Sequence, residues 1–221
     1  LLDLIQELEK VEGIDRYRIS SIEPNLLTNE IIEFIKYSHK FLPHLHIPMQ
    51  SGSDNILKSM QRRYKAKLYE DKVQKINSYL PDACIGVDVI VGFPGESNED
   101  FQTTYNFLDD LDISYLHVFS YSERDHTEAV KIDLKIPRKT ISERSKILHQ
   151  LSFKKRHRFY MNNIGKVREV LIENWTEGIL TGISDNYIPV KINGIPEEVN
   201  QILKVRFIDI NDGIIRGEKL D

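Results

Sequence analysis

Apolar residues along the first 162 positions recur in two different periods. Short runs rich in β-branched and aromatic residues are typical of strands, and stretches with apolar residues three or four positions apart are typical of helices. The predicted strands lie at residues 17–22, 45–49, 84–91 and 115–119. The predicted helices lie at residues 1–11, 28–35, 56–60, 67–80, 97–111 and 141–162. Because strand and helix alternate, the pattern predicts an α/β fold of parallel βα units.

Beyond Gly165 the pattern changes to short β-rich segments separated by turns. These segments lie at residues 167–172, 178–183, 187–192, 202–208 and 214–217. Their spacing of roughly ten residues predicts a small all-β barrel. We therefore expect an α/β domain over residues 1–162 and a separate β module over residues 163–221.

Composition narrows the class of protein. The chain has 221 residues, with 30 Lys and Arg against 34 Asp and Glu and a formal net charge of -4, which excludes a histone-like polycation and an acidic disordered tail. No apolar run approaches the roughly 20 residues that a membrane-spanning helix needs. A helical pattern already starts at Leu1 without an initiator Met, so we expect the chain to be part of a longer protein.

Cysteine usage excludes several kinds of site. Cys84 is the one cysteine of the chain, so a disulfide scaffold, a structural zinc site of several thiolates and an iron–sulfur cluster all lack ligands here. Its place at the start of an apolar strand predicts a small buried side chain rather than a ligand.

Polar side chains follow or interrupt the predicted strands at positions that suit ligand binding. Ligands of parallel βα arrays collect at the carboxyl ends of the strands. Glu23, Gln50 and Asp88 would form an acceptor-rich edge there, suited to ribose hydroxyls and an ammonium group. Arg62 follows a short helix that could return it to this edge, where a guanidinium group suits a carboxylate. Hydroxyls, an amine and a carboxylate together describe an amino-acid nucleoside.

Asp88 is the most informative of these residues. It interrupts the apolar run CIGVDVIV at residues 84–91, and burying a carboxylate without a partner costs several kcal/mol. We expect it to meet a cation or a hydroxyl-rich ligand, or the strand to be only partly buried. His44, His46 and His117 lie in or beside strands, but they lack the close spacing of a zinc motif. We expect core or edge histidines there, and no metal site.

A basic cluster with aromatic neighbours precedes the β tail. Basic residues beside aromatic rings provide the phosphate contacts and base stacking of RNA binding, although a solvated helix face gives the same pattern. In the tail, a tryptophan in a predicted loop between two β segments is expected to be exposed enough to stack on a base. The candidate RNA-binding residues are Lys154, Lys155, Arg156, Arg158 and Trp175.

Several motifs together resemble those of the radical S-adenosylmethionine methylthiotransferases. The motifs are LHIPMQSGSD at residues 45–54 with MQRRY at 60–64, and DVIVGFPGE at residues 88–96. The segment RISSIEP at residues 18–24 is most similar to the branch that modifies threonylcarbamoyladenosine in tRNA. The tail from Gly165 to Glu218 resembles the TRAM module that ends these proteins. The resemblance covers nearly the whole chain.

The resemblance implies a fold and a reaction. The fold is the later βα units of a partial radical-SAM (βα)6 barrel, followed by a small OB-like TRAM barrel that binds RNA. The reaction adds a methylthio group to C2 of threonylcarbamoyladenosine near the anticodon, by radical chemistry with S-adenosylmethionine. Within the family, isopentenyladenosine in tRNA and a ribosomal protein are alternative substrates. Outside it, the alternative is a non-catalytic RNA-binding module.

The resemblance also implies residue roles at the edge that the strand ends had already indicated. Glu23 would contact the methionine amine, Arg62 the methionine carboxylate, with Arg63 as the neighbouring choice, and Gln50 a ribose hydroxyl. Three residues of the following strand would contact the nucleoside, with Asp88 on the ribose and the other two on the adenine. This set of cofactor-binding residues is Glu23, Gln50, Arg62, Asp88, Ile90 and Gly92; no catalytic residue is assigned.

One departure from the family pattern is large. Its enzymes hold a 4Fe-4S cluster on a Cys-x-x-x-Cys-x-x-Cys loop and a second cluster on an N-terminal domain, and this chain has neither set of cysteines. We expect both clusters in the full-length protein only, and this chain alone to be inactive. The implied partners are tRNA and the missing cluster-bearing N-terminal region. No membrane partner is expected, and the expected location is the cytoplasm. A barrel enzyme for phosphorylated or aldehyde substrates would need a phosphate-binding glycine loop or a strand lysine, and neither is found.

Overall fold

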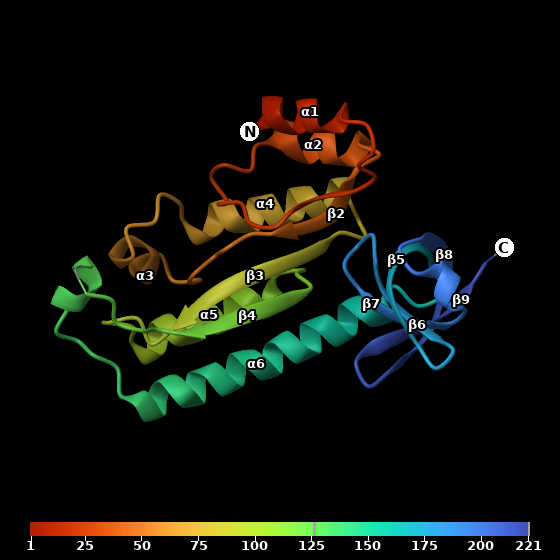
Figure 1. The fold of residues 1–221 in the computed structure, drawn as a ribbon. Helices are drawn as coiled ribbons and strands as arrows, with labels where there is room; N and C mark the ends of the chain where they lie inside the picture. Colours follow the sequence, from red (N-terminus) through yellow and green to blue (C-terminus); the bar gives the residue numbers. More distant parts are fainter. Residues whose placement is uncertain (126, 221) are drawn as a thin grey trace.

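A computed structural model describes residues 1–125 and 127–220, and its first part is built on a parallel sheet (Figure 1). The strands β1 (Tyr17–Ile19), β2 (Phe41–His46), β3 (Cys84–Val91) and β4 (Tyr115–Ser120) lie in the order β1-β2-β3-β4. Each pair of neighbours is parallel, because helical connections carry the chain back after each strand. The prediction of parallel βα units is confirmed.

Helices connect and cover the sheet. Thr28 caps the second helix by accepting a hydrogen bond from the Ile31 N–H, and Ser97 with Asp100 forms a capping box at the fifth. The helical elements are α1 (Leu2–Glu9), α2 (Asn29–Tyr37), α3 (Asp54–Ser59), α4 (Ala66–Tyr79), α5 (Asn98–Asp110), η1 (Glu128–Lys131) and α6 (Arg138–Met161). Among the described residues, no helix combines the length and apolar character that crossing a membrane requires.

The two faces of the sheet differ. In β3, Ile85, Val87, Val89 and Val91 are at most 1% exposed and pack in one core with apolar residues of α2, α4, α5 and α6. Since successive strand residues point to opposite faces, Asp88 of the same strand lies on the other face, which that core does not cover. This open face carries the polar residues of the sheet.

Several predicted elements differ in extent from those observed, β2 and β5 among them. Strand β2 begins at Phe41 rather than at residue 45 and so contains Pro43. The register of β2 with β1 is irregular beside Pro43, and pairing of β2 with β3 starts only at His44. The missing N–H of the proline therefore leaves no gap in the hydrogen bonds to either strand. Strand β5 continues through Trp175, which places this residue in a strand and not in the predicted loop.

The C-terminal part is a closed β barrel, as the spacing of its segments predicts. Its strands are β5 (Val167–Thr176), β6 (Ile179–Ser184), β7 (Pro189–Asn193), β8 (Ile202–Asn211) and β9 (Ile214–Lys219), with η2 (Pro196–Glu198) before β8. They close in the order β5-β6-β7-β9-β8. Helix α6 leads from the sheet to this barrel (Figure 1), and the predicted division at residues 162 and 163 falls between α6 and β5.

Charged and aromatic contacts join the barrel to the sheet. The carboxylate of Asp82, in the turn before β3, pairs with Lys166 and Arg168 of the barrel segment. The ring of Tyr187, from the turn before β7, stacks on His44 of β2 with centroids 4.2 Å apart. The barrel therefore covers the amino-terminal end of the open face and leaves the carboxyl end free.

Candidate functional site

Two charged residues that the sequence placed at one edge are in contact. Glu23 follows β1, and Arg62 follows α3, which brings the chain back across the carboxyl edge of the sheet. The Arg62 guanidinium Nη1 donates to Glu23 Oε1 at 3.1 Å, and both side chains are partly exposed. Arg63 was the alternative residue for the carboxylate contact. It is exposed, and it is Arg62 that pairs with Glu23. The two residues line a shallow hollow with Asn25, Leu26, Met60, Gln61 and Arg63.

Gln50 joins this edge to β3 through its backbone. Its N–H donates to the carbonyl oxygen of Asp88, and its own carbonyl oxygen accepts from the N–H of Ile90. The φ of Gln50 is 71°, a left-handed conformation that few residues other than glycine adopt. A strained turn thus holds Gln50 beside the Asp88–Ile90 segment. Backbone strain of this kind is concentrated at functional sites.

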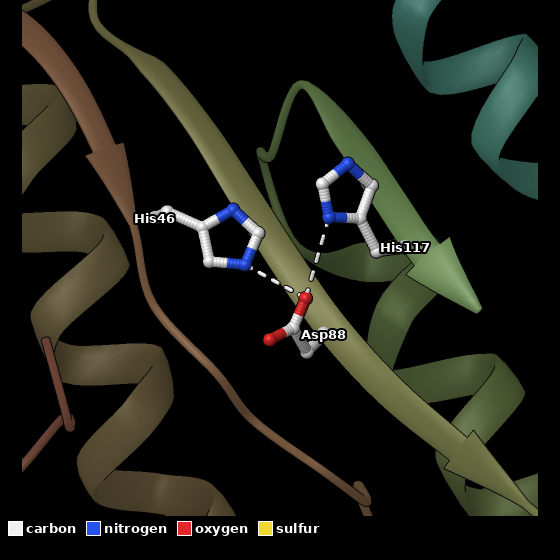
Figure 2. A group of neighbouring side chains, drawn as sticks. All are labelled: His46, Asp88 and His117. Carbon is white, nitrogen blue, oxygen red and sulfur yellow. Dashed lines mark hydrogen bonds and ion pairs between the residues drawn. The ribbon is translucent and has the colours of Figure 1, made fainter. Parts of the chain in front are cut away.

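Asp88 lies between two histidines of the neighbouring strands. Figure 2 shows its carboxylate between the rings of His46 and His117. Oδ1 of Asp88 is 2.7 Å from Nε2 of His46 and 3.4 Å from Nδ1 of His117. Burial and the neighbouring His46 lower the pKa of His117. The partner that Asp88 requires is therefore a pair of imidazoles, on a strand with one open face.

A row of rings extends from this carboxylate toward the barrel. The Tyr115 hydroxyl lies 3.1 Å from Nε2 of His44 and 3.5 Å from Nδ1 of His46. Burial, with the charge of Arg18 nearby, lowers the pKa of His44 to about 3, so this ring is neutral. Arg18 packs over the Tyr187 ring, 4.3 Å from its centroid. The open face thus carries a continuous polar row.

Gly92 and Ile90 follow on the same strand. Gly92 has a φ of 78°, and a Cβ there would lie 2.4 Å from a side-chain carbon of Ile141, so the turn after β3 requires glycine. Its N–H donates to Glu96, whose carboxylate is buried against Arg144. Ile90 is half-buried, with Phe119 as its register partner on β4. These contacts fix the turn that bounds the candidate site.

The structure separates the proposed cofactor residues into two groups. Glu23 and Arg62 contact each other at the edge, whereas the Asp88 carboxylate contacts His46 and His117 lower on the open face. Gln50 is linked to the second group by backbone hydrogen bonds. The histidine neighbours of Asp88 were missed as a group, because the sequence does not show which residues of neighbouring strands lie side by side.

The predicted RNA-binding residues have different surroundings. Lys154 is exposed. Arg156 is also exposed and lies 5.7 Å from the centroid of the Tyr115 ring. Arg158 pairs with Asp112. Trp175 is 40% exposed and donates from Nε1 to the carbonyl oxygen of Gly194.

Lys155 is a correction to the predicted RNA-binding set. It is 4% exposed, and its ammonium group donates to the carbonyl oxygens of Asp109 and Leu111. Burial lowers its pKa to about 8. The side chain fastens α6 to the end of α5, and it does not project to solvent with its neighbours because it lies on the inner side of the helix.

Comparisons with known proteins show which proteins this chain is similar to. The radical SAM superfamily matches residues 1–108. Threonylcarbamoyladenosine tRNA methylthiotransferase MtaB of Aquifex aeolicus is 43% identical over 93% of this chain and 49% of its own length. tRNA-2-methylthio-N(6)-dimethylallyladenosine synthase of Syntrophus aciditrophicus is 35% identical over 99% of this chain and 48% of its own length. The chain thus spans about half the length of the curated relatives it matches.

A solved structure supports the fold alone. Coproporphyrinogen III oxidase (HemN) from Escherichia coli, described as a radical SAM enzyme, aligns with a TM-score of 0.50 at 14% identity. The alignment covers 72% of this chain and 36% of that one. Helices around a parallel sheet are therefore the feature that the two molecules share.

Proposed function

We propose that this chain, which belongs to the methylthiotransferase family of the radical S-adenosylmethionine superfamily, provides the S-adenosylmethionine-binding edge and the RNA-binding module of a threonylcarbamoyladenosine tRNA methylthiotransferase. The observation that carries the proposal is the contact between Glu23 and Arg62 at the carboxyl edge of the sheet, in a chain 43% identical to a relative of that name. The reaction of the longer protein adds a methylthio group to C2 of the modified adenosine near the anticodon.

The fold supports an assignment of each part. We assign β1 to β4 with their helices to the later βα units of a (βα)6 barrel, and the closed β barrel to a TRAM module. An open sheet face and a free carboxyl edge are what such units present when further strands complete the barrel. The boundary of the two units is placed at residues 162 and 163.

S-adenosylmethionine fits the charges of the edge. Its methionine part carries an ammonium and a carboxylate on one carbon, and Glu23 and Arg62 present one charge of each sign 3.1 Å apart. Of the remaining residues, Gln50 and Asp88 are assigned to ribose hydroxyls, and the Ile90–Gly92 turn to the adenine. When bound, the cofactor supplies the radical and the methyl group.

An iron–sulfur cluster does not fit the residues of this chain. Cys84 is 2% exposed in β3, and burial raises the pKa of its thiol to about 12, so it is not the thiolate that iron requires. We propose that a cluster-bearing N-terminal region supplies both 4Fe-4S clusters and that this chain alone does not turn over. Its place of action is the cytoplasm, where tRNA is modified.

The choice of substrate branch follows from the relatives. The identity of 43% to the threonylcarbamoyladenosine enzyme exceeds the 35% to the dimethylallyladenosine enzyme over nearly the same part of the chain. Threonylcarbamoyladenosine is therefore the proposed substrate. Nucleoside mass spectrometry of tRNA exposed to the full-length protein reports which adenosine gains the methylthio group.

Binding of S-adenosylmethionine to the chain tests the edge directly. Isothermal titration is expected to show binding that weakens at least about 10-fold in Arg62→Ala and in Glu23→Gln, since each removes one charged contact to the methionine part. Arg206→Ala is the matched control, because Arg206 is an exposed arginine on β8 of the barrel, outside the hollow that Glu23 and Arg62 line. Its affinity is expected to equal that of the unmodified chain. Equal affinity in all three variants would remove Glu23 and Arg62 from the pocket.

A second measurement tests the RNA contacts. The double variant Lys154→Glu with Arg156→Glu is expected to lower tRNA affinity about 10-fold or more at low salt and to flatten its dependence on salt, because phosphate contacts release counterions. Lys139→Glu is the control on the same helix, about 22 Å away along its axis. If the control lowers affinity as much as the double variant, the contact surface is not at the barrel end of α6.

A further inference from the structure

Three donor side chains meet on the open face of the sheet. His46 ends β2, Asp88 lies within β3, and His117 lies within β4 (Figure 2). Their donor atoms all lie within 4.8 Å of one another. Asp88 and His117 are register partners, and His46 pairs with Gly86, the preceding residue on the same face of β3. The parallel sheet itself, rather than a loop, therefore holds the three donors together.

No lysine or arginine of the described residues pairs with the carboxylate at the centre. Among the described residues, the ion-pair contacts of Asp88 are those to His46 and His117. Arg156 lies farther along the row, over the ring of Tyr115. A partly buried carboxylate on an otherwise apolar strand is costly without a compensating charge. A bound cation supplies that charge.

The donor set matches one class of cation. Two imidazole nitrogens and one carboxylate oxygen are typical ligands of divalent first-row transition metals, including Zn²⁺. Zn–N and Zn–O distances of about 2.0–2.2 Å place pairs of donors about 3–3.5 Å apart. The contact of His117 with Asp88, at 3.4 Å, is already in this range. The contact of His46 with Asp88 has to lengthen by less than about 1 Å to reach it.

Neighbouring groups orient the donors and leave access. The Tyr115 hydroxyl lies 3.5 Å from Nδ1 of His46, and Nε2 of the same ring is directed at Asp88. Residues that contact the second nitrogen of a histidine in this way orient metal ligands in proteins. Gly86 leaves the space for this tyrosine, since a Cβ there would lie 2.3 Å from the hydroxyl oxygen. The side chain of His117 is 50% exposed, which gives an ion a path from the open face.

We propose that His46, Asp88 and His117 bind a divalent transition-metal ion, with Zn²⁺ as the expected occupant. The site goes beyond the proposed cofactor edge, and it uses no cysteine. Both contacts of Asp88 with the histidines are made by Oδ1. This leaves its second oxygen for the ribose hydroxyl to which Asp88 is assigned, so the two sites share a residue without sharing an atom.

Zn²⁺ titration of the chelator-treated chain tests the proposal. Isothermal titration is expected to show one ion per chain, and Co²⁺ used as a spectroscopic probe is expected to give visible absorption bands of a nitrogen- and oxygen-ligated ion. Asp88→Asn and His117→Ala are each expected to weaken Zn²⁺ affinity at least about 10-fold. His149→Ala is the matched control, because His149 is exposed on α6 and bonded to its own helix.

A comparison of Arg62→Ala with His117→Ala separates this site from the cofactor edge. Arg62→Ala is expected to lose S-adenosylmethionine affinity and keep Zn²⁺ affinity, whereas His117→Ala is expected to lose Zn²⁺ affinity and keep that of S-adenosylmethionine. Circular dichroism of His117→Ala checks that the fold is retained. The proposal is overturned if the chain binds no Zn²⁺, or if Asp88→Asn and His117→Ala bind it as tightly as His149→Ala does.

Discussion

The open face of the parallel sheet and the interior of the closed barrel carry opposite kinds of side chain. The open face of the sheet carries His44, His46, Asp88, Tyr115 and His117, all close enough to contact one another in a row. The barrel interior is apolar and built from residues such as Phe207, which is fully buried. The two regions adjoin, yet one gathers titratable groups and the other is mainly apolar.

The difference follows from closure. A small barrel has no edges, so each inward side chain meets another side chain and must be apolar or paired. The sheet has one covered face, and the other accepts polar groups because solvent or a ligand reaches it. Chemistry therefore gathers on the open sheet, and the barrel has only its outer surface for binding.

Phe207→Ala should have the largest effect on this comparison. The ring is 0% exposed at the centre of the barrel core, and removing such a ring typically costs about 3–5 kcal/mol of unfolding free energy. Chemical denaturation followed by near-ultraviolet circular dichroism measures this loss. S-adenosylmethionine affinity is expected to remain within about twofold, because the edge lies on the other region.

His117→Ala is the counterpart on the open face. Its side chain is 50% exposed, so the expected change in unfolding free energy is within about 0.5 kcal/mol. The contrast between the regions fails if His117→Ala destabilises the chain as much as Phe207→Ala does. In that case the polar row belongs to the core that holds the fold together.

The fold was largely predictable because its signals are local. The apolar run of β3 and the helical pattern over residues 97–111 each depend on neighbours in the sequence, and both predicted elements are present. The start of β2 was predicted too late, at residue 45, because the missing N–H of Pro43 is harmless only through an irregular register with β1, which is a property of two segments. Trp175 was assigned to a loop for the same reason, since pairing with β6 is what extends β5.

The candidate site was predictable only in part. The placement of Glu23 and Arg62 at one edge was expected from two strand ends and a short helix, whereas their contact with each other was not. The contact of Asp88 with His46 and His117 depends on the register of three strands, and local spacing carries no signal for it. Lys155 was misassigned because a basic run does not show which side of the helix faces α5.

The junction of the two regions provides the last test of the comparison. Burial opposes ionisation of Asp82, but the hydrogen bond from Lys166 and the charge of Arg168 outweigh it and lower the pKa of Asp82. A carboxyl whose folded pKa lies below its unfolded value, about 3.9 for Asp, stabilises the fold above that value. This stabilisation is lost as the pH falls through the folded pKa.

Asp82→Asn removes this contribution and is expected to cost less than about 1 kcal/mol at pH 7, because the pair is partly exposed. Unfolding measured from pH 6 to pH 3 should show the difference between the chain and Asp82→Asn shrinking as the pH falls. Asp209→Asn is the matched control, since Arg216 lowers the pKa of Asp209 entirely within the barrel. Asp82→Asn should separate the unfolding transitions of sheet and barrel, and Asp209→Asn should not. A single shared transition in both variants means that aromatic packing of Tyr187 on His44, not charge, couples the two regions.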